Sequence, residues 1–208
     1  MSVDRTLTER RPGGPGMSTQ RQPRITPEQY LEQERRAETK SEYFAGEVFA
    51  MSGASQAHNL IVSNLIGTLW TQLRGGACRV YPGDMRVKVQ SSGLYTYPDV
   101  GVVCGPAELE DEHFDTLLNP IVLIEIRSAK PERNVRGPHR PEHYRQIPSV
   151  QELLLIAQNQ PHVARYRRQT ERDWLLTEFR GQEESVQLTS IGCTLFLRDI
   201  YDGILPLH

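Results

Sequence analysis

The chain has 208 residues, of which 38% are hydrophobic, and a formal net charge of −2. This length suits one domain with an ordinary buried core, and the charge excludes an overall basic field for binding nucleic acid, so that any DNA-binding cations must be concentrated locally. No apolar run reaches the roughly 18 residues of a membrane span, and the N-terminus lacks a signal peptide's apolar segment. We therefore expect a soluble, cytoplasmic protein that does not contact membranes.

The N-terminal residues 1–23 are polar and are broken by a Pro-Gly-Gly-Pro-Gly run. Such a composition buries too little apolar surface to order the chain. We predict a disordered tail over residues 1–23 and a single folded domain over residues 24–208. The sequence leaves open whether Met1 or Met17 is the true start.

Two helices are predicted before the first inner strands. Thr26, Pro27 and Gln29 form a helix start with a capping box, and this helix should end near Thr39. A small hairpin is expected over residues 43–51. Over residues 55–74, apolar residues recur at helical spacing, which predicts a long helix packed against a sheet.

The sequence leaves the roles of two polar residues near these helices ambiguous. His58 lies in the first turn of the long helix, where the helix dipole disfavours a charged imidazole, so we expect a neutral, hydrogen-bonded side chain. Glu42 follows the first helix and by itself is typical of a solvated glutamate at a helix end.

The next strands are expected over residues 78–81 and 85–90. In the second, Arg86 and Lys88 alternate with apolar residues and should lie on an open, wet face. An acidic segment over residues 108–115 follows, and it should face away from any DNA because it repels phosphate. The three cysteines are odd in number and far apart in apolar surroundings, which predicts reduced core thiols rather than a disulfide framework or a zinc site.

Two apolar stretches carry acids and organise the rest of the chain. Asp99 precedes the apolar strand 100–104, and Glu125 lies near the end of the aliphatic strand 121–127. A buried carboxylate is seldom left without a neutralising cation, because an unpaired charge out of water costs several kcal/mol or more. Arg127 shares a strand face with Glu125, about 7 Å away.

Beyond residue 150 the sequence predicts an antiparallel meander over residues 151–179. Its strand-length apolar runs are separated by turns around residues 159–161 and 171–173. Together with the long helix, these strands predict an α+β fold with a mixed central sheet.

The spacing of Pro98-Asp99 and Glu125-Ile126-Arg127 resembles the signature of the PD-(D/E)XK nuclease superfamily. Further stretches are similar to the Uma2 family of restriction endonucleases, namely Ser41-Glu42-Tyr43-Phe44-Ala45-Gly46-Glu47, Ala57-His58-Asn59-Leu60, Thr96-Tyr97-Pro98-Asp99, Glu125-Ile126-Arg127-Ser128 and His143-Tyr144-Arg145. The resemblance spans residues 25–201. It implies a restriction-endonuclease-like core in residues 24–208, with a central mixed β-sheet, a long packed helix and an antiparallel meander.

The resemblance also implies a site and a reaction. Asp99 and Glu125 would hold Mg²⁺, for which Mn²⁺ can substitute, with the carbonyl of Ile126 as a third oxygen ligand. Glu42 would lie close to the catalytic centre and assist the metal. The implied substrate is DNA, whose phosphodiester bonds the enzyme would hydrolyse, and related nucleases often form homodimers to cut both strands.

The basic partner of the metal-bound water departs from the family pattern. The strand lysine of the superfamily is replaced by Arg127, which stays protonated where a lysine can exchange a proton. Relatives carry a lysine at the start of the following helix, where this chain has His139 or Arg140, and Lys130 is a reserve candidate. Which of these four residues attends the water is left open.

Three hypotheses for the function remain at this point. The first is a Mg²⁺-dependent DNA endonuclease with a site weakened by the loss of the lysine. The second is a catalytically inactive nuclease fold that binds nucleic acid or protein, with Glu125 and Arg127 as a structural ion pair. The third is an unrelated α+β domain with a coincidental Pro-Asp. The DNA sequence recognised and the oligomeric state are not predicted.

Overall fold

The computed structural model describes residues 24–128 and 138–204. The predicted tail over residues 1–23 and the candidate Lys130 lie outside the described residues. The helices are α1 (Pro27–Glu34), α2 (Gln56–Leu73), α3 (Arg140–Tyr144) and α4 (Leu197–Ile200). The strands are β1 (Ser41–Phe44), β2 (Glu47–Ala50), β3 (Cys78–Pro82), β4 (Arg86–Val89), β5 (Leu94–Thr96), β6 (Val100–Cys104), β7 (Thr116–Leu117), β8 (Val122–Arg127), β9 (Glu152–Ala157), β10 (His162–Arg168), β11 (Trp174–Arg180), β12 (Ser185–Leu188) and β13 (Cys193–Phe196).

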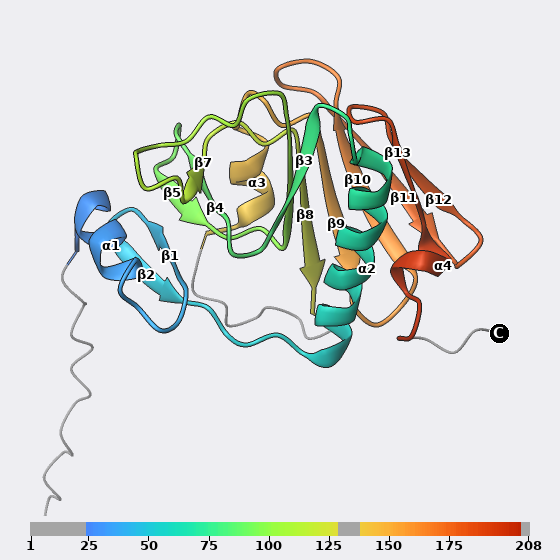
Figure 1. The fold of residues 1–208 in the computed structure, drawn as a ribbon, viewed down its shortest axis with the longest axis horizontal. Coiled ribbons are helices and arrows are strands. Elements are labelled where there is room, and N and C mark those ends of the chain that lie inside the picture. The colour runs from blue at the N-terminus through green and yellow to red at the C-terminus, as the bar shows by residue number, and fades with distance from the viewer. Residues whose placement is uncertain (1–23, 129–137, 205–208) are drawn as a thin grey trace, which may run out of the picture.

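The described strands form two main sheets and a hairpin (Figure 1). The central sheet has the order β11-β10-β9-β8-β6-β3, and the small sheet has the order β2-β1-β5-β4-β7. Strands β8 and β9 pair in parallel, whereas β6 pairs with β8 antiparallel. This arrangement confirms the predicted α+β fold with a mixed sheet, and β9, β10 and β11 form the predicted meander.

Helix α2 covers one face of the central sheet, as its apolar periodicity predicted. Its residues Ile61, Leu65 and Leu69 are fully buried against Val122 and Ile124 of the central strands. Figure 1 shows α2 along this face, with α4 and the β12–β13 hairpin beside it. Burying each such side chain stabilises the fold by about 1.5–3 kcal/mol, so this layer fixes the strands that carry the acids.

The opposite face of the central sheet is covered by the small sheet and α3. Leu123 and Leu153 of the central sheet share a core with Val87 of the small sheet and Tyr144 of α3. Figure 1 shows α3 between the two sheets. Strand β8 is therefore covered on both faces, which explains its continuous aliphatic sequence.

The local signals near the N-terminus are also observed. Thr26 caps α1 and forms the capping box with Gln29, although α1 ends at Glu34 rather than near Thr39. Strands β1 and β2 form the predicted hairpin. No helix in the described part of the chain is long and apolar enough to cross a membrane.

The prediction that Arg86 and Lys88 lie on an open face was wrong. Arg86 is only 3% exposed, and its guanidinium lies 2.8 Å from Asp115. Lys88 pairs with Glu110. The acidic segment folds back over β4 and supplies these partners, which strand periodicity alone could not reveal.

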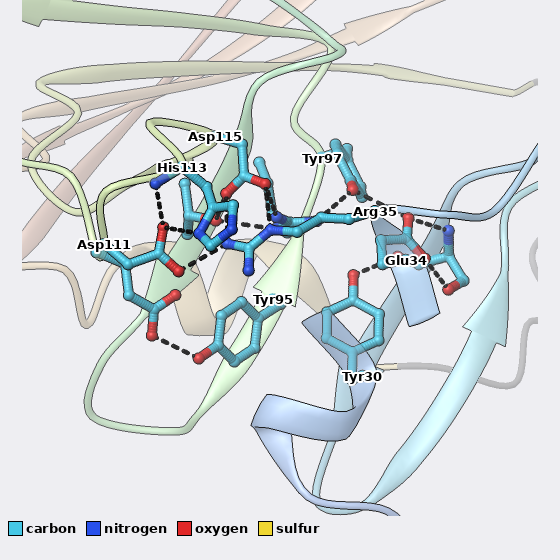
Figure 2. Close-up of polar contacts among 12 residues, drawn as sticks. Tyr30, Glu34, Arg35, Tyr95, Tyr97, Asp111, His113 and Asp115 are labelled. Atoms are coloured by element: carbon cyan, nitrogen blue, oxygen red, sulfur yellow. Dashed lines mark hydrogen bonds and ion pairs between the residues drawn. The ribbon is translucent and has the colours of Figure 1, made fainter. Parts of the chain in front are cut away.

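Helix α1 provides the other cation for this acidic segment. Figure 2 shows Arg35 reaching Asp111 and Asp115, with 2.7 Å between the closest atoms of each pair. The hydroxyl of Tyr97 donates to Glu34 and accepts a bond from Arg86. The segment that we expected to repel phosphate is thus largely neutralised within the fold.

The prediction of reduced cysteines was wrong for two of them. Cys78 and Cys104 form a disulfide, because they lie directly opposite each other where β3 pairs with β6. The strand register brings these two cysteines together. Their separation along the sequence therefore led to the wrong prediction that both are reduced. Cys193 is free and buried.

We expect Asp115→Asn to lower the free energy of unfolding by about 2 kcal/mol at pH 7, because buried Arg86 loses the charge of its ion-pair partner. Burial alone would raise the pKa of Asp115, but bonds from Arg35 and the charge of Arg86 hold this pKa well below its ordinary value. The stabilisation is therefore complete above pH ~4 and is lost as the pH falls toward the folded-state pKa. Urea unfolding at pH 7 and pH 3 should show the difference shrinking at pH 3.

Asp84→Asn is the matched control for this measurement. Asp84 also pairs with a cation, Lys40, but its side chain is 88% exposed. We expect its substitution to change stability by less than about 0.5 kcal/mol. Equal effects of the two variants would contradict the structural role of Asp115.

Candidate active site

The structure brings Asp99 and Glu125 together at one end of the two inner strands. Val100 of β6 pairs with Ile124 of β8, so the next position along the ladder places Asp99 opposite Glu125. The Asp99 carboxylate also accepts a hydrogen bond of 2.7 Å from the backbone N–H of Ile126. This bond holds Asp99 against β8, directly before its own strand β6 begins.

Glu125 is a buried carboxylate with a partner on each oxygen. It is 7% exposed, and it accepts a bond of 2.6 Å from the Tyr144 hydroxyl and one of 3.0 Å from Arg140. Burial raises the pKa of Glu125 to about 7, with Asp99 and Glu42 adding to the rise and Arg140 opposing it. The contact with Arg140 therefore offsets the effect of burial on Glu125 only in part.

Glu42 belongs to the same cluster, so the interpretation of a solvated helix-end glutamate was wrong. It lies in β1, is 5% exposed, and contacts Arg140 at 2.8 Å. The Thr96 hydroxyl of the neighbouring strand β5 donates to the same oxygen of Glu42. Pairing of β1 with β5 in the small sheet directs this side chain toward α3, a placement that local sequence does not show.

Arg140 is the cation that the structure places on the acids. It is the first residue of α3, and its guanidinium bridges Glu42 of the small sheet and Glu125 of the central sheet. Burial disfavours its charge, but Glu125 and Glu42 outweigh that effect and raise the pKa of Arg140. The Thr96 and Tyr144 hydroxyls lie 3.2 Å apart and close the cluster.

His58 contacts Asp99 from the first turn of α2. Its Nε2 atom lies 3.0 Å from Asp99 Oδ1, so the expected hydrogen bond is present. The bond to Asp99 outweighs burial and raises the pKa of His58 above its ordinary value. This contact with a carboxylate favours the charged imidazole, opposite to the effect of the helix dipole on which the prediction relied.

Two of the other predicted cations, Arg127 and His139, do not contact the acids in the described part of the chain. Arg127 ends β8 and is exposed, and within residues 24–128 and 138–204 it forms no ion pair, so the proposed Glu125–Arg127 pair was wrong. His139 is exposed and faces Glu142 at 3.3 Å. Lys130 lies outside the described residues. Of His139 and Arg140, the residue that lies beside the acids is therefore Arg140.

The donor set suits a hard divalent cation. Asp99, Glu125 and Glu42 bring three carboxylates near one another, against the charge of Arg140 and the partial charge of His58. No group of three or more His, Cys, Asp or Glu side chains in the described residues could hold a metal by itself. Mg²⁺ normally binds through one or two carboxylates and keeps several waters, so two carboxylates, Asp99 and Glu125, suffice in number and type for such an ion.

Sequence reasoning did not predict which side chains contact the acids of this site. Tyr144 and Arg140 lie four residues apart in α3, and this spacing puts both on one helical face toward Glu125. That signal was available in the sequence. The Thr96 bond to Glu42 and the His58 contact with Asp99 depend on tertiary packing, and no local pattern predicts them.

The comparisons with known proteins identify the family of this chain. The Uma2 family, described as "Putative restriction endonuclease", matches residues 27–197. The uncharacterized protein slr1290 of Synechocystis sp. is 31% identical over 88% of this chain and 94% of its own. A second Synechocystis protein, the uncharacterized sll1609, is 32% identical over 79% of this chain and 93% of its own.

A solved structure has the same fold. The crystal structure of a putative nuclease belonging to DUF820 from Anabaena variabilis superimposes with a TM-score of 0.69 at 20% identity. The match covers 87% of this chain and 99% of that chain.

Replacing Arg140 should show how strongly the acids depend on it. We expect Arg140→Gln to lower the free energy of unfolding by about 3 kcal/mol, since it leaves buried Glu42 and Glu125 without their shared cation. Arg140→Lys keeps the charge and should lose less. Urea unfolding measures both, and an unchanged stability of Arg140→Gln would contradict the bridging role.

Proposed function

This chain belongs to the Uma2 family, and on that premise we propose that it is a Mg²⁺-dependent endonuclease that hydrolyses DNA phosphodiester bonds. The observation that carries the proposal is the concentration of carboxylates at the ends of β6 and β8 with too little positive charge. Asp99 and Glu125 would hold the metal with the Ile126 carbonyl, and Mn²⁺ can substitute. When bound, the ion supplies charge stabilisation for the phosphate and activation of the attacking water.

The surrounding residues position the carboxylates. His58 and the Ile126 N–H orient Asp99, with contacts of 3.0 and 2.7 Å. Tyr144 orients Glu125 through one oxygen. Because these contacts come from α2, β8 and α3, they hold both acids in a fixed geometry on rigid elements, as a catalytic site requires.

Arg140 would act through its charge. It takes the place at the start of α3 where relatives carry a lysine, but arginine does not exchange a proton near neutral pH. We therefore assign it the stabilisation of negative charge on the acids and the phosphate, and expect a slower reaction than a lysine would support. The Arg127 side chain, exposed at the end of β8, is assigned to phosphate binding. We further propose a cytoplasmic enzyme that acts as a homodimer.

A second candidate function is favoured by the Arg140 contacts. Its guanidinium bonds both Glu42 and Glu125, an arrangement that also suits a nuclease fold that binds nucleic acid or protein without cutting. The two candidates differ in their expected affinity for a divalent cation, which the endonuclease requires and the non-catalytic module does not.

Calorimetric titration with Mn²⁺ and Mg²⁺ distinguishes the candidates. We expect the wild type to bind the ion and Asp99→Asn to weaken binding by about tenfold or more, because a direct ligand is lost. Asp84→Asn, on an exposed carboxylate, is the control and should bind as the wild type does. A wild type without divalent affinity would favour the non-catalytic module.

Nicking of supercoiled plasmid in Mg²⁺ tests catalysis directly. We expect the wild type to nick, EDTA to abolish the activity, and Glu125→Gln to lower the rate by about 100-fold or more, as loss of a preorganised charge in an active site does. Glu47→Gln, an exposed substitution in β2, should leave the rate unchanged. Activity that survives in Glu125→Gln would refute the assignment of this site.

A further inference from the structure

A hollow of about 290 Å³ opens on the central sheet beside the acids. It lies where β8, β9 and β10 run next to one another. Its lining includes Arg127, Ala157, Asn159, Gln160, His162 and Ala164. The volume is near the lower limit of about 300 Å³ for ligand pockets, which suits one sugar and base rather than a protein segment.

The strand register places this hollow on the same sheet face as Glu125. Glu125 pairs with Leu155 and Arg127 pairs with Ala157 across β8 and β9, while Ala164 of β10 pairs with Leu155. Paired residues share a face of the sheet. The hollow therefore begins one strand away from the acid that would hold the metal.

Charge distinguishes Arg127 from the other cations of this region. Arg140 is engaged by Glu42 and Glu125, and His58 is engaged by Asp99. Arg127 is exposed at the rim of the hollow, and in the described part of the chain no acid pairs with it. An unpaired guanidinium beside an acidic centre is suited to a phosphate, which it can bind with two parallel hydrogen bonds.

The rest of the lining suits the sugar and base. Asn159 and Gln160 lie in the turn between β9 and β10 and carry amides that both donate and accept. Ala157 and Ala164 present small apolar side chains on which a ring can pack. The ring of His162 is held by Glu178, whose carboxylate lies 3.2 Å from its Nε2 atom.

We propose that this hollow is a subsite for one nucleotide of the DNA strand, next to the phosphate that is cut. Arg127 binds the backbone phosphate, the amides of Asn159 and Gln160 bond the sugar or base, and the alanines support its ring. The inference rests on the proposed function, since it names where the substrate of that same site lies.

The phosphate contact is tested by binding rather than by cleavage. A fluorescein-labelled duplex is titrated in EDTA, which prevents cutting, at several salt concentrations and followed by anisotropy. Loss of one phosphate contact should reduce the slope of log K against log salt by about 0.9, so Arg127→Gln should show this reduction and bind more weakly. Arg36→Gln, whose side chain lies just after α1 and is 77% exposed, should leave the slope unchanged.

The nucleotide contact is tested with thymidine 5′-monophosphate. In the wild type, titration should shift the side-chain amide signals of Asn159 and Gln160 in NMR spectra. Gln160→Ala should weaken binding without altering the phosphate contact, and Ala164→Leu should block the floor of the hollow. Circular dichroism checks that each variant is folded. If Ala164→Leu does not fold, the test rests on Gln160→Ala, whose substitution lies in a surface turn.

The outcomes separate this inference from the proposed function. Nucleotide binding that depends on Arg127 and Gln160, in a wild type that nicks no plasmid, would support the subsite and refute the endonuclease. Plasmid nicking with an unchanged salt slope in Arg127→Gln and no amide shifts would refute the subsite and support the endonuclease. A wild type that binds neither duplex nor nucleotide would overturn the subsite.

Discussion

The structure depends on partners for the carboxylates that lie buried in the space between two sheets. Glu42 comes from the small sheet and Glu125 from the central sheet, and both are nearly buried. Ionised carboxylates in such a place cost several kcal/mol each unless a cation and hydrogen bonds compensate. Arg140 of α3 provides the shared cation, so the contact that neutralises the acids also ties the small sheet, α3 and the central sheet into one arrangement.

This compensation is incomplete, and the deficit connects the fold to the function. Burial raises the pKa of Glu125 to about 7 even though Arg140 is in contact, because Asp99 and Glu42 add their own charges. A purely structural ion pair would gain nothing from a third carboxylate nearby. The divalent cation that we propose would supply further positive charge here, and restriction-endonuclease-like families generally use divalent metals.

The sequence predicted those features that depend on one element at a time. A glutamate among aliphatic residues and an aspartate at a strand's start pointed to Asp99 and Glu125, and periodicity predicted α2 and the meander. It failed where two distant segments meet. Burial of Arg86 requires Asp115 to fold over β4, and the Cys78–Cys104 bond requires the β3–β6 register. Which segment covers a strand, and which strand pairs with it, depend on packing between parts of the chain that are distant in sequence.

The two arginines illustrate how structure divides roles that the sequence could not separate. Arg127 follows Glu125 closely along β8 and was therefore the natural candidate to neutralise it, whereas Arg140 was one of several basic residues near the next helix. The fold reverses this order, because α3 packs over the Glu125 carboxylate while the end of β8 opens to solvent. Since Arg140 is the residue that pairs with Glu125, the exposed Arg127 keeps its charge available for the phosphate that we propose it binds at the end of β8.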